Sequence, residues 1–201
     1  MKKFLTLALA ALSFFGAATA ANNTKKAAPK DTLVFTTIVS APVTSIKNQN
    51  NSGTCWAYSS LAFLESEALK KNPSLKPADV DLCESFVVAK TYNDRADRAV
   101  RTHGDVSFSQ GGSFYDVIYC MDRYGLVPEG TMPYPKTLYG DSLFNFKHFF
   151  PGLEAFVGSV AKGDHKTINP IWKKTVAQMV DGYFGEAPKT FKVKGKEYTP
   201  H

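Results

Sequence analysis

A short segment of this sequence combines an amide, a glycine and a thiol at spacings that suit nucleophilic chemistry. Gln49, Gly53, Cys55 and Trp56 follow one another closely along the chain. A cysteine thiolate can attack a carbonyl carbon, and the amide of Gln49 could donate a hydrogen bond to the oxyanion that this attack creates. Gly53 is expected to supply the backbone freedom for a tight turn before Cys55. The segment therefore predicts covalent catalysis at Cys55.

The apolar residues after Cys55 recur at the spacing of a helix. Leu61, Leu64 and Ala68 follow Ala57 at i+4, i+7 and i+11, and a Lys-Lys-Asn-Pro run comes next. Cys55 is therefore expected at a helix N-terminus, where unpaired N–H groups and the positive end of the helix dipole favour the thiolate. The alternative is a buried, inert cysteine, which is the commoner fate of this residue type.

The order and spacing of these four residues resemble the Q-x-x-x-G-x-C-W signature of the papain-like cysteine peptidases. By this resemblance Cys55 is the nucleophile and Gln49 is the oxyanion-hole donor. The closer similarity is to the bleomycin hydrolase and aminopeptidase C branch, which it resembles in Ser52 before the nucleophile and in the segments 109–114 (SQGGSF), 124–128 (YGLVP), 133–135 (PYP) and 195–200 (GKEYTP). The chain departs from that branch at Cys83, where a serine is usual.

The resemblance implies an α+β chain with the papain-like cysteine proteinase fold. It would consist mainly of the helical lobe built round the Cys55 helix, with the barrel lobe incomplete. The residue pattern predicts further helices over 82–98, from Phe114 to a stop at Gly125, and after Asn169-Pro170. Strands are expected over 32–40 and in the alternating segment around Gly195.

Two adjacent glycines, Gly111 and Gly112, offer a second candidate element of the site. Without Cβ atoms they would let an extended peptide approach and pair with the backbone. The resemblance places them, with Trp56, along the subsite next to the scissile bond. The alternative is a plain loop before the following helix, because glycine also marks loops that bind nothing.

A thiol peptidase also needs an imidazole base and a group that orients it. The four histidines are His103, His148, His165 and His201. The first three lie in surroundings that suit structural or surface roles, and His201 has no Asn after it to orient its ring. The base and its Asn are therefore expected beyond residue 201, and this chain alone is expected to be inactive.

The first twenty residues resemble a secretory signal. Residues 1–3 are Met-Lys-Lys, residues 4–15 form an apolar stretch, and residues 18–20 read Ala-Thr-Ala, as at a cleavage site. Residues 21–31 are polar and Lys-rich, which predicts a flexible arm before a peptidase domain over 32–201. The sequence thus predicts export to the periplasm or the extracellular space, and no membrane anchor.

Composition limits the partners. Lys and Arg total 24 against 18 Asp and Glu, a net charge of +6 that would fall to +4 without Lys2 and Lys3. That excess is too small to indicate nucleic-acid binding. The three cysteines lack the paired spacing of a zinc site, so neither a metal nor a cofactor is predicted. Family resemblance implies a homo-oligomer, a hexamer.

The leading interpretation is an exported thiol peptidase, an aminopeptidase by resemblance, that acts on peptides through an acyl-enzyme on Cys55. The alternative is a catalytically inactive exported module that keeps the papain-like cleft and binds peptides.

Overall fold

The computed structural model describes residues 33, 35–164 and 166–201. Val39–His201 form one compact unit, and the described residues before Val39 lie outside it. The strand predicted over 32–40 is wrong for its described residues, which are exposed and have no strand partner to satisfy their backbone hydrogen-bonding groups. The predicted signal over 1–20 and arm over 21–31 lie outside the described residues.

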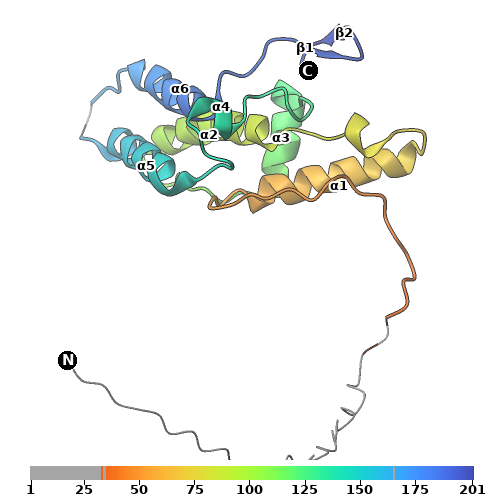
Figure 1. Cartoon of the computed structure of the whole chain (residues 1–201). Helices are drawn as coiled ribbons and strands as arrows, with labels where there is room; N and C mark the ends of the chain where they lie inside the picture. Colours follow the sequence, from red (N-terminus) through yellow and green to blue (C-terminus); the bar gives the residue numbers. More distant parts are fainter. Residues whose placement is uncertain (1–32, 34, 165) are drawn as a thin grey trace, which may run out of the picture. The chain divides into compact units, whose positions relative to one another are not determined.

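The compact unit is α-rich and carries a small two-stranded sheet (Figure 1). Its elements are α1 (Cys55–Lys71), the 3₁₀ turn η1 (Pro77–Asp79), α2 (Glu84–Arg101), α3 (Phe114–Tyr124), the short α4 (Pro135–Leu138), α5 (Phe146–Lys162), α6 (Ile171–Phe184), β1 (Phe191–Val193) and β2 (Lys196–Tyr198). The helices predicted after Cys55, Phe114 and Asn169-Pro170 are confirmed. The helix predicted over 82–98 is confirmed with bounds shifted to Glu84–Arg101. None of the helices in the described residues is long and apolar enough to cross a membrane.

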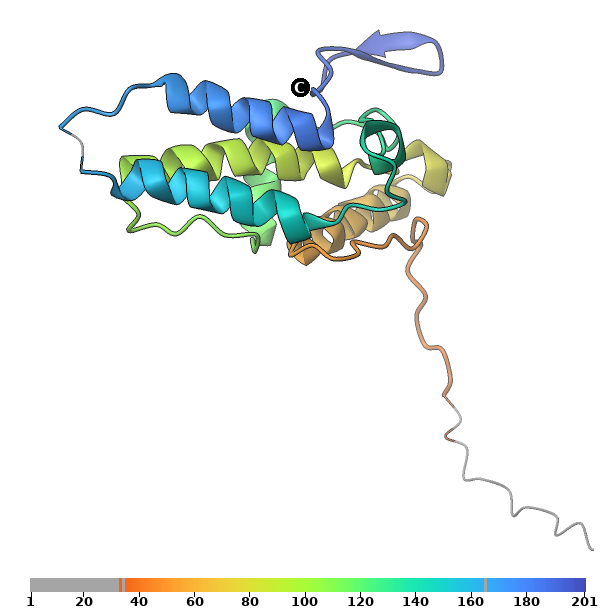
Figure 2. The ribbon, with the colours of Figure 1, turned by 60° about the vertical axis from the view of Figure 1, so that its left-hand side comes forward.

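Helix α2 is the centre of the packing. It contacts α1, α3, α5 and α6, and in Figure 2 the helices α5, α2 and α6 lie side by side. Tyr92, in the middle of α2, is completely buried, with aromatic rings around it from Phe108, Phe146, Phe150 and Phe184. Burial of such large side chains is the main stabilising contribution to the packing of α2 against α5 and α6. Helix α2 thus provides a fixed platform for α1 and α3.

The segment predicted as one strand around Gly195 is an antiparallel hairpin. Phe191 pairs with Tyr198 and Val193 with Lys196. The turn residues Lys194 and Gly195 both have positive φ, 51° and 81°. That conformation matches the twist of a two-residue hairpin, and glycine adopts it without steric cost.

Candidate active site

Cys55 is the first residue of α1, as the sequence predicts. Its side chain is an exposed free thiol, whereas the free thiols of Cys83 and Cys120 are buried. The first N–H groups of a helix have no acceptor within the helix and point out of its N-terminus. In the first turn of α1, the Ser59 hydroxyl donates a hydrogen bond to the carbonyl of Cys55 at 2.8 Å. Cys55 therefore has both the exposure and the helix-terminal place that a nucleophilic thiolate needs.

A groove with a cavity volume of ≈ 630 Å³ opens beside Cys55. None of its lining residues is charged: it is lined by Cys55, Trp56, Ser59, Ser60, Phe63, Gly112, Ser113 and Phe114. The rings of Phe63 from α1 and Phe114 from α3 meet edge to face at 5.7 Å, and both are largely exposed to solvent. The surface next to the thiol can thus accept an apolar group.

Trp56 joins α1 to the loop that precedes α3. Its indole is buried, and its Nε1–H donates to the carbonyl of Gln110 at 3.0 Å. The side-chain oxygen of Gln110 accepts the backbone N–H of Gly53 at 2.8 Å, and Tyr92 donates its hydroxyl to the same Gln110 carbonyl at 3.4 Å. Gln110 thereby links three elements. Sequence reasoning gave it no role, although it lies directly before the two glycines.

Gly53 is required for a different reason from the one expected. Its φ is not in the left-handed region, so the turn itself does not demand glycine. A Cβ at this position would lie 2.7 Å from the Cβ of Gln110, closer than two carbon atoms can pack. The absence of a side chain at Gly53 lets Gln110 approach the start of α1.

The two glycines of the 111–112 pair have different surroundings. A Cβ on Gly112 would lie 2.6 and 2.7 Å from two indole carbons of Trp56 and 2.8 Å from a guanidinium nitrogen of Arg95, whereas a Cβ on Gly111 would have no neighbour within 4 Å. Gly112 lines the groove. The pair thus lies in a loop and also borders the groove, so it fits both of the alternatives that the sequence left open.

Arg95, on α2, holds the loop and the start of α3 together. It donates to the carbonyls of Ser109 and Gly111 and to the carboxylate of Asp116, the last at 2.9 Å. Asp116 also accepts the backbone N–H of Ser113 at 2.8 Å, which caps α3. Burial alone would raise the pKa of Asp116, but the Ser113 and Arg95 hydrogen bonds together lower it. The carboxylate is therefore held ionised at this helix N-terminus.

The structure does not place the Gln49 amide in the groove. Its Nε2 donates to the carbonyl of Ser52 at 2.6 Å, and the Ser52 hydroxyl donates to the carbonyl of Gln49 at 2.8 Å. These two bonds close a tight turn directly before α1. Gln49 is near Cys55 in the chain, but an oxyanion-hole role requires its second N–H, or a rotation of the amide away from Ser52.

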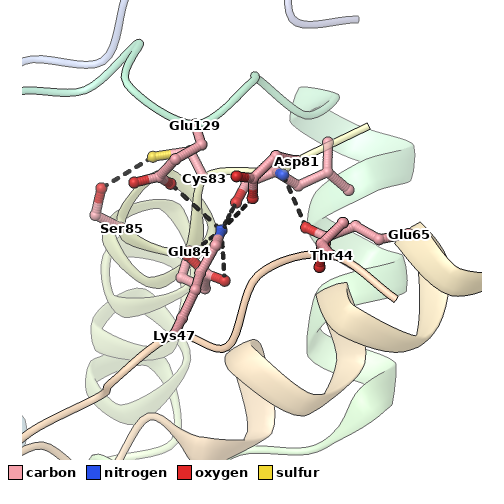
Figure 3. Close-up of polar contacts among 9 residues, drawn as sticks. Thr44, Lys47, Glu65, Asp81, Cys83, Glu84, Ser85 and Glu129 are labelled. Atoms are coloured by element: carbon pink, nitrogen blue, oxygen red, sulfur yellow. Dashed lines mark hydrogen bonds and ion pairs between the residues drawn. The ribbon is translucent and has the colours of Figure 1, made fainter. Parts of the chain in front are cut away.

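The segment that carries Gln49 is fixed by a half-buried cluster of charges, the Lys47 cluster, formed by Lys47, Asp81, Glu84 and Glu129. Figure 3 shows the Lys47 ammonium surrounded by the three carboxylates, which it pairs with at 2.8, 3.0 and 3.5 Å respectively. Burial would lower the pKa of Lys47, but the bond to Asp81 and the charges of Glu84 and Glu129 raise it above its usual range. Burial raises the pKa of Glu84 to about 7, against the opposing effect of Lys47.

None of the described histidines lines the groove. His103 and His148 are exposed, and His165 lies outside the described residues. The His201 ring nitrogen lies 2.9 Å from the carbonyl of Asp122. That carbonyl is eight residues along α3 from the groove residue Phe114, or about 12 Å at the rise of a helix. The structure therefore places no described imidazole beside Cys55.

Comparison with known proteins decides the family. A model of the Peptidase C1-like family matches residues 3–142, which is more than half of the chain and includes the whole segment from Gln49 to Gly112. The chain belongs to the Peptidase C1-like family. The resemblance to papain-like cysteine peptidases is thus confirmed.

Two relatives of this Peptidase C1-like chain indicate its branch. Aminopeptidase G of Lactobacillus delbrueckii subsp. lactis is 27% identical over 135 residues, which cover 56% of this chain and 28% of the relative. The mitochondrial Cysteine proteinase 1 of Saccharomyces cerevisiae is 25% identical over 150 residues, which cover 65% of this chain and 30% of the relative. Both agree with the bleomycin hydrolase and aminopeptidase branch. The chain spans less than a third of the length of either relative.

The expected export of this Peptidase C1-like protein is contradicted by the same comparison. The name of the yeast relative places that protein in the mitochondrion, and neither relative's name denotes a periplasmic or extracellular protein. The family match also begins at residue 3, inside the stretch interpreted as a signal. A charged start, an apolar stretch and small residues are weak evidence for a signal, because these features are matters of composition alone. The prediction of an exported protein is therefore wrong.

Proposed function

We propose that this protein is a cysteine peptidase that uses Cys55 as its nucleophile, with aminopeptidase action as the more specific form. The observation that supports the proposal most strongly is the exposed Cys55 thiol at the start of α1, at the edge of an uncharged groove. Family membership and the aminopeptidase named among the relatives point to the same chemistry.

In this reaction the Cys55 thiolate attacks the carbonyl carbon of the scissile peptide bond. The Sγ–C bond forms, the C–N bond breaks, and the amine leaves after it has received a proton. Water then cleaves the thioester and releases the acid. The proton transfers require an imidazole, and we assign none of the described histidines to that role. The Cys55 backbone N–H and the Gln49 amide are the proposed donors to the oxyanion.

The proposed substrate is an extended peptide with an apolar side chain near the scissile bond. Gly112 has no side chain to cover its backbone at the edge of the groove, which suits main-chain pairing with a peptide. Phe63 and Phe114 offer aromatic surface to a side chain. In the papain-like fold that we infer, the described helices make up the helical lobe and the hairpin is a small part of the barrel lobe.

The test is peptidase activity of the full-length protein on aminoacyl and peptidyl fluorogenic substrates. Cys55→Ser should abolish turnover. Cys83→Ser is the matched control and should retain it, because Cys83 is buried away from the groove. Gln49→Ala should lower kcat by about 10²-fold, because one oxyanion donor typically contributes about 3 kcal/mol.

A result in which Cys55→Ser keeps full activity would refute the proposal. If the full-length protein binds peptides without cleaving them, the inactive peptide-binding module is the better interpretation. An unchanged kcat in Gln49→Ala would leave Cys55 as nucleophile and remove Gln49 from the oxyanion hole.

A further inference from the structure

Arg95 packs against Trp56 and Gly112, two residues that line the groove, and it donates hydrogen bonds to three acceptors. One terminal nitrogen donates to the carbonyls of Ser109 and Gly111, and the other donates to Asp116. The side chain is 17% exposed. A guanidinium has five N–H donors in a rigid fork. Arg95 uses that fork on three acceptors of one loop and helix, so it is suited to hold these elements rather than to bind a substrate.

Arg95 also contacts Trp56, the residue next to the nucleophile. Its guanidinium carbon lies 5.4 Å from the centre of the Trp56 ring, within the range of a cation–π contact. A Cβ on Gly112 would meet both this guanidinium and the Trp56 indole. The backbone of Gly112 is therefore packed directly against Arg95 and Trp56, which fix its distance from the start of α1.

These contacts connect Arg95 to the peptide-binding edge in two steps. Its bond to the Gly111 carbonyl sets the direction of the peptide unit between Gly111 and Gly112, because a peptide unit is planar and its N–H points opposite to its C=O. The N–H of Gly112 therefore points away from Arg95. Gly112 lines the groove, where an extended peptide can accept a hydrogen bond from a backbone N–H that is directed away from Arg95.

We propose that Arg95 is a positioning residue that aligns the Gly111–Gly112 backbone for substrate pairing beside Cys55. The inference rests on the proposed function and deepens it, since it names what orients the peptide-binding edge. Arg95 does not touch the reacting atoms. Its loss should impair the capture of peptides and leave the intrinsic reactivity of the Cys55 thiol intact.

The test compares two reagents that alkylate Cys55 in the full-length protein. A dipeptidyl chloromethyl ketone, phenylalanyl-alanyl chloromethyl ketone, carries a peptide backbone, and iodoacetamide does not. With either reagent the Sγ–C bond forms and the carbon–halogen bond breaks, and the electron pair leaves with the halide. Mass spectrometry of the Cys55 peptide over time gives both second-order rate constants.

In the wild-type protein the second-order rate constant of the peptidyl reagent should exceed that of iodoacetamide by more than the difference in the chemical reactivity of the two reagents. We call this excess the preference for the peptidyl reagent. Arg95→Met should lower the peptidyl rate constant by about tenfold or more, because small misplacement of a binding edge has large effects. The iodoacetamide rate constant should change by less than about twofold, since the thiol and its helix terminus are untouched. Arg95→Lys should give an intermediate loss, because an ammonium cannot reproduce the fork. Arg98→Met, one turn further along α2 and exposed, is the matched control and should behave as wild type.

The outcomes separate this inference from the proposed function. If the wild-type protein shows no preference for the peptidyl reagent, the proposed peptide groove is refuted and the role of Arg95 falls with it. If the wild-type preference exists and folded Arg95→Met or Arg95→Lys keeps it, only the role of Arg95 is overturned. Thermal unfolding of each variant shows whether it is folded at the assay temperature. If Arg95→Met is not folded, the rate constants of Arg95→Lys test the role of Arg95.

Discussion

Adding one methyl group at Gly112 should destabilise the protein far more than the same change at Gly111. The Cβ of Gly112→Ala would lie 2.6 and 2.7 Å from carbon atoms of Trp56 and 2.8 Å from Arg95, whereas unstrained carbon contacts are about 3.5 to 4.0 Å. Neither neighbour is free to withdraw, because the Trp56 indole is hydrogen-bonded to Gln110 and Arg95 is held by its three acceptors.

Overpacking of this kind costs about 1 to 3 kcal/mol, and the fixed neighbours favour the upper end. For a unit of this size, about 3 kcal/mol corresponds to a fall in Tm of about 6 to 12 °C. Gly111→Ala is the matched control. It meets nothing within 4 Å, and neither glycine has positive φ. Its effect should stay within about 0.5 kcal/mol.

Urea and thermal unfolding of the two alanine variants measure this difference directly. Iodoacetamide labelling of Cys55 in the folded variants then shows whether the local shift reaches the thiol. Equal stability of the two variants would refute the reasoning, because it would mean that the loop can move away from Trp56 without cost.

Two further predictions follow from burial. Cys55 should be alkylated by iodoacetamide near neutral pH faster than Cys83 or Cys120, because Cys55 is exposed and the other two are buried. Burial raises the pKa of Cys83, and it raises the pKa of Cys120 to about 12. Equal labelling of the three thiols in the folded protein, measured by mass spectrometry, would contradict the placement of Cys55. Glu84→Gln should become more favourable relative to wild type as pH rises from 5 to 8, by up to about 3 kcal/mol. The wild-type carboxyl, whose pKa burial raises to about 7, must ionise in that window at a cost to the folded state, whereas Gln stays neutral. Urea unfolding at both pH values tests this, and a difference independent of pH would show that Glu84 ionises normally.

The sequence was sufficient where a local pattern decides the structure. The apolar spacing after Ala57 and the glycine at 125 correctly predicted the start of α1 and the end of α3. Gly125 has a φ of 77° and also lies against the carbonyl of Pro200, which leaves no room for a side chain. Local signals of this kind report directly on the backbone that they require.

The sequence was insufficient where distant contacts decide. The segment 32–40 has strand propensity, but its described residues have no partner. Helix α5 was not predicted, because Pro151 and Gly152 interrupt its helical pattern, and yet buried contacts of Phe150 and Leu153 keep it intact. The roles of Arg95 and Gln110 depend on residues 14 to 57 positions away, so no local pattern could reveal them.

The three hydrogen bonds accepted by Gln110 have a consequence for local motion. Gly53, Trp56 and Tyr92 come from the turn before α1, from α1 and from α2, and all three donate to this one residue. Gly53 donates to the Gln110 side-chain oxygen, and Trp56 and Tyr92 donate to its backbone carbonyl. A movement of the whole loop away from α1 and α2 would therefore break all three bonds in a single event. The backbone amide of Gly53 and the indole N–H of Trp56 should therefore exchange with solvent deuterium at a common rate, as members of one cooperative opening unit.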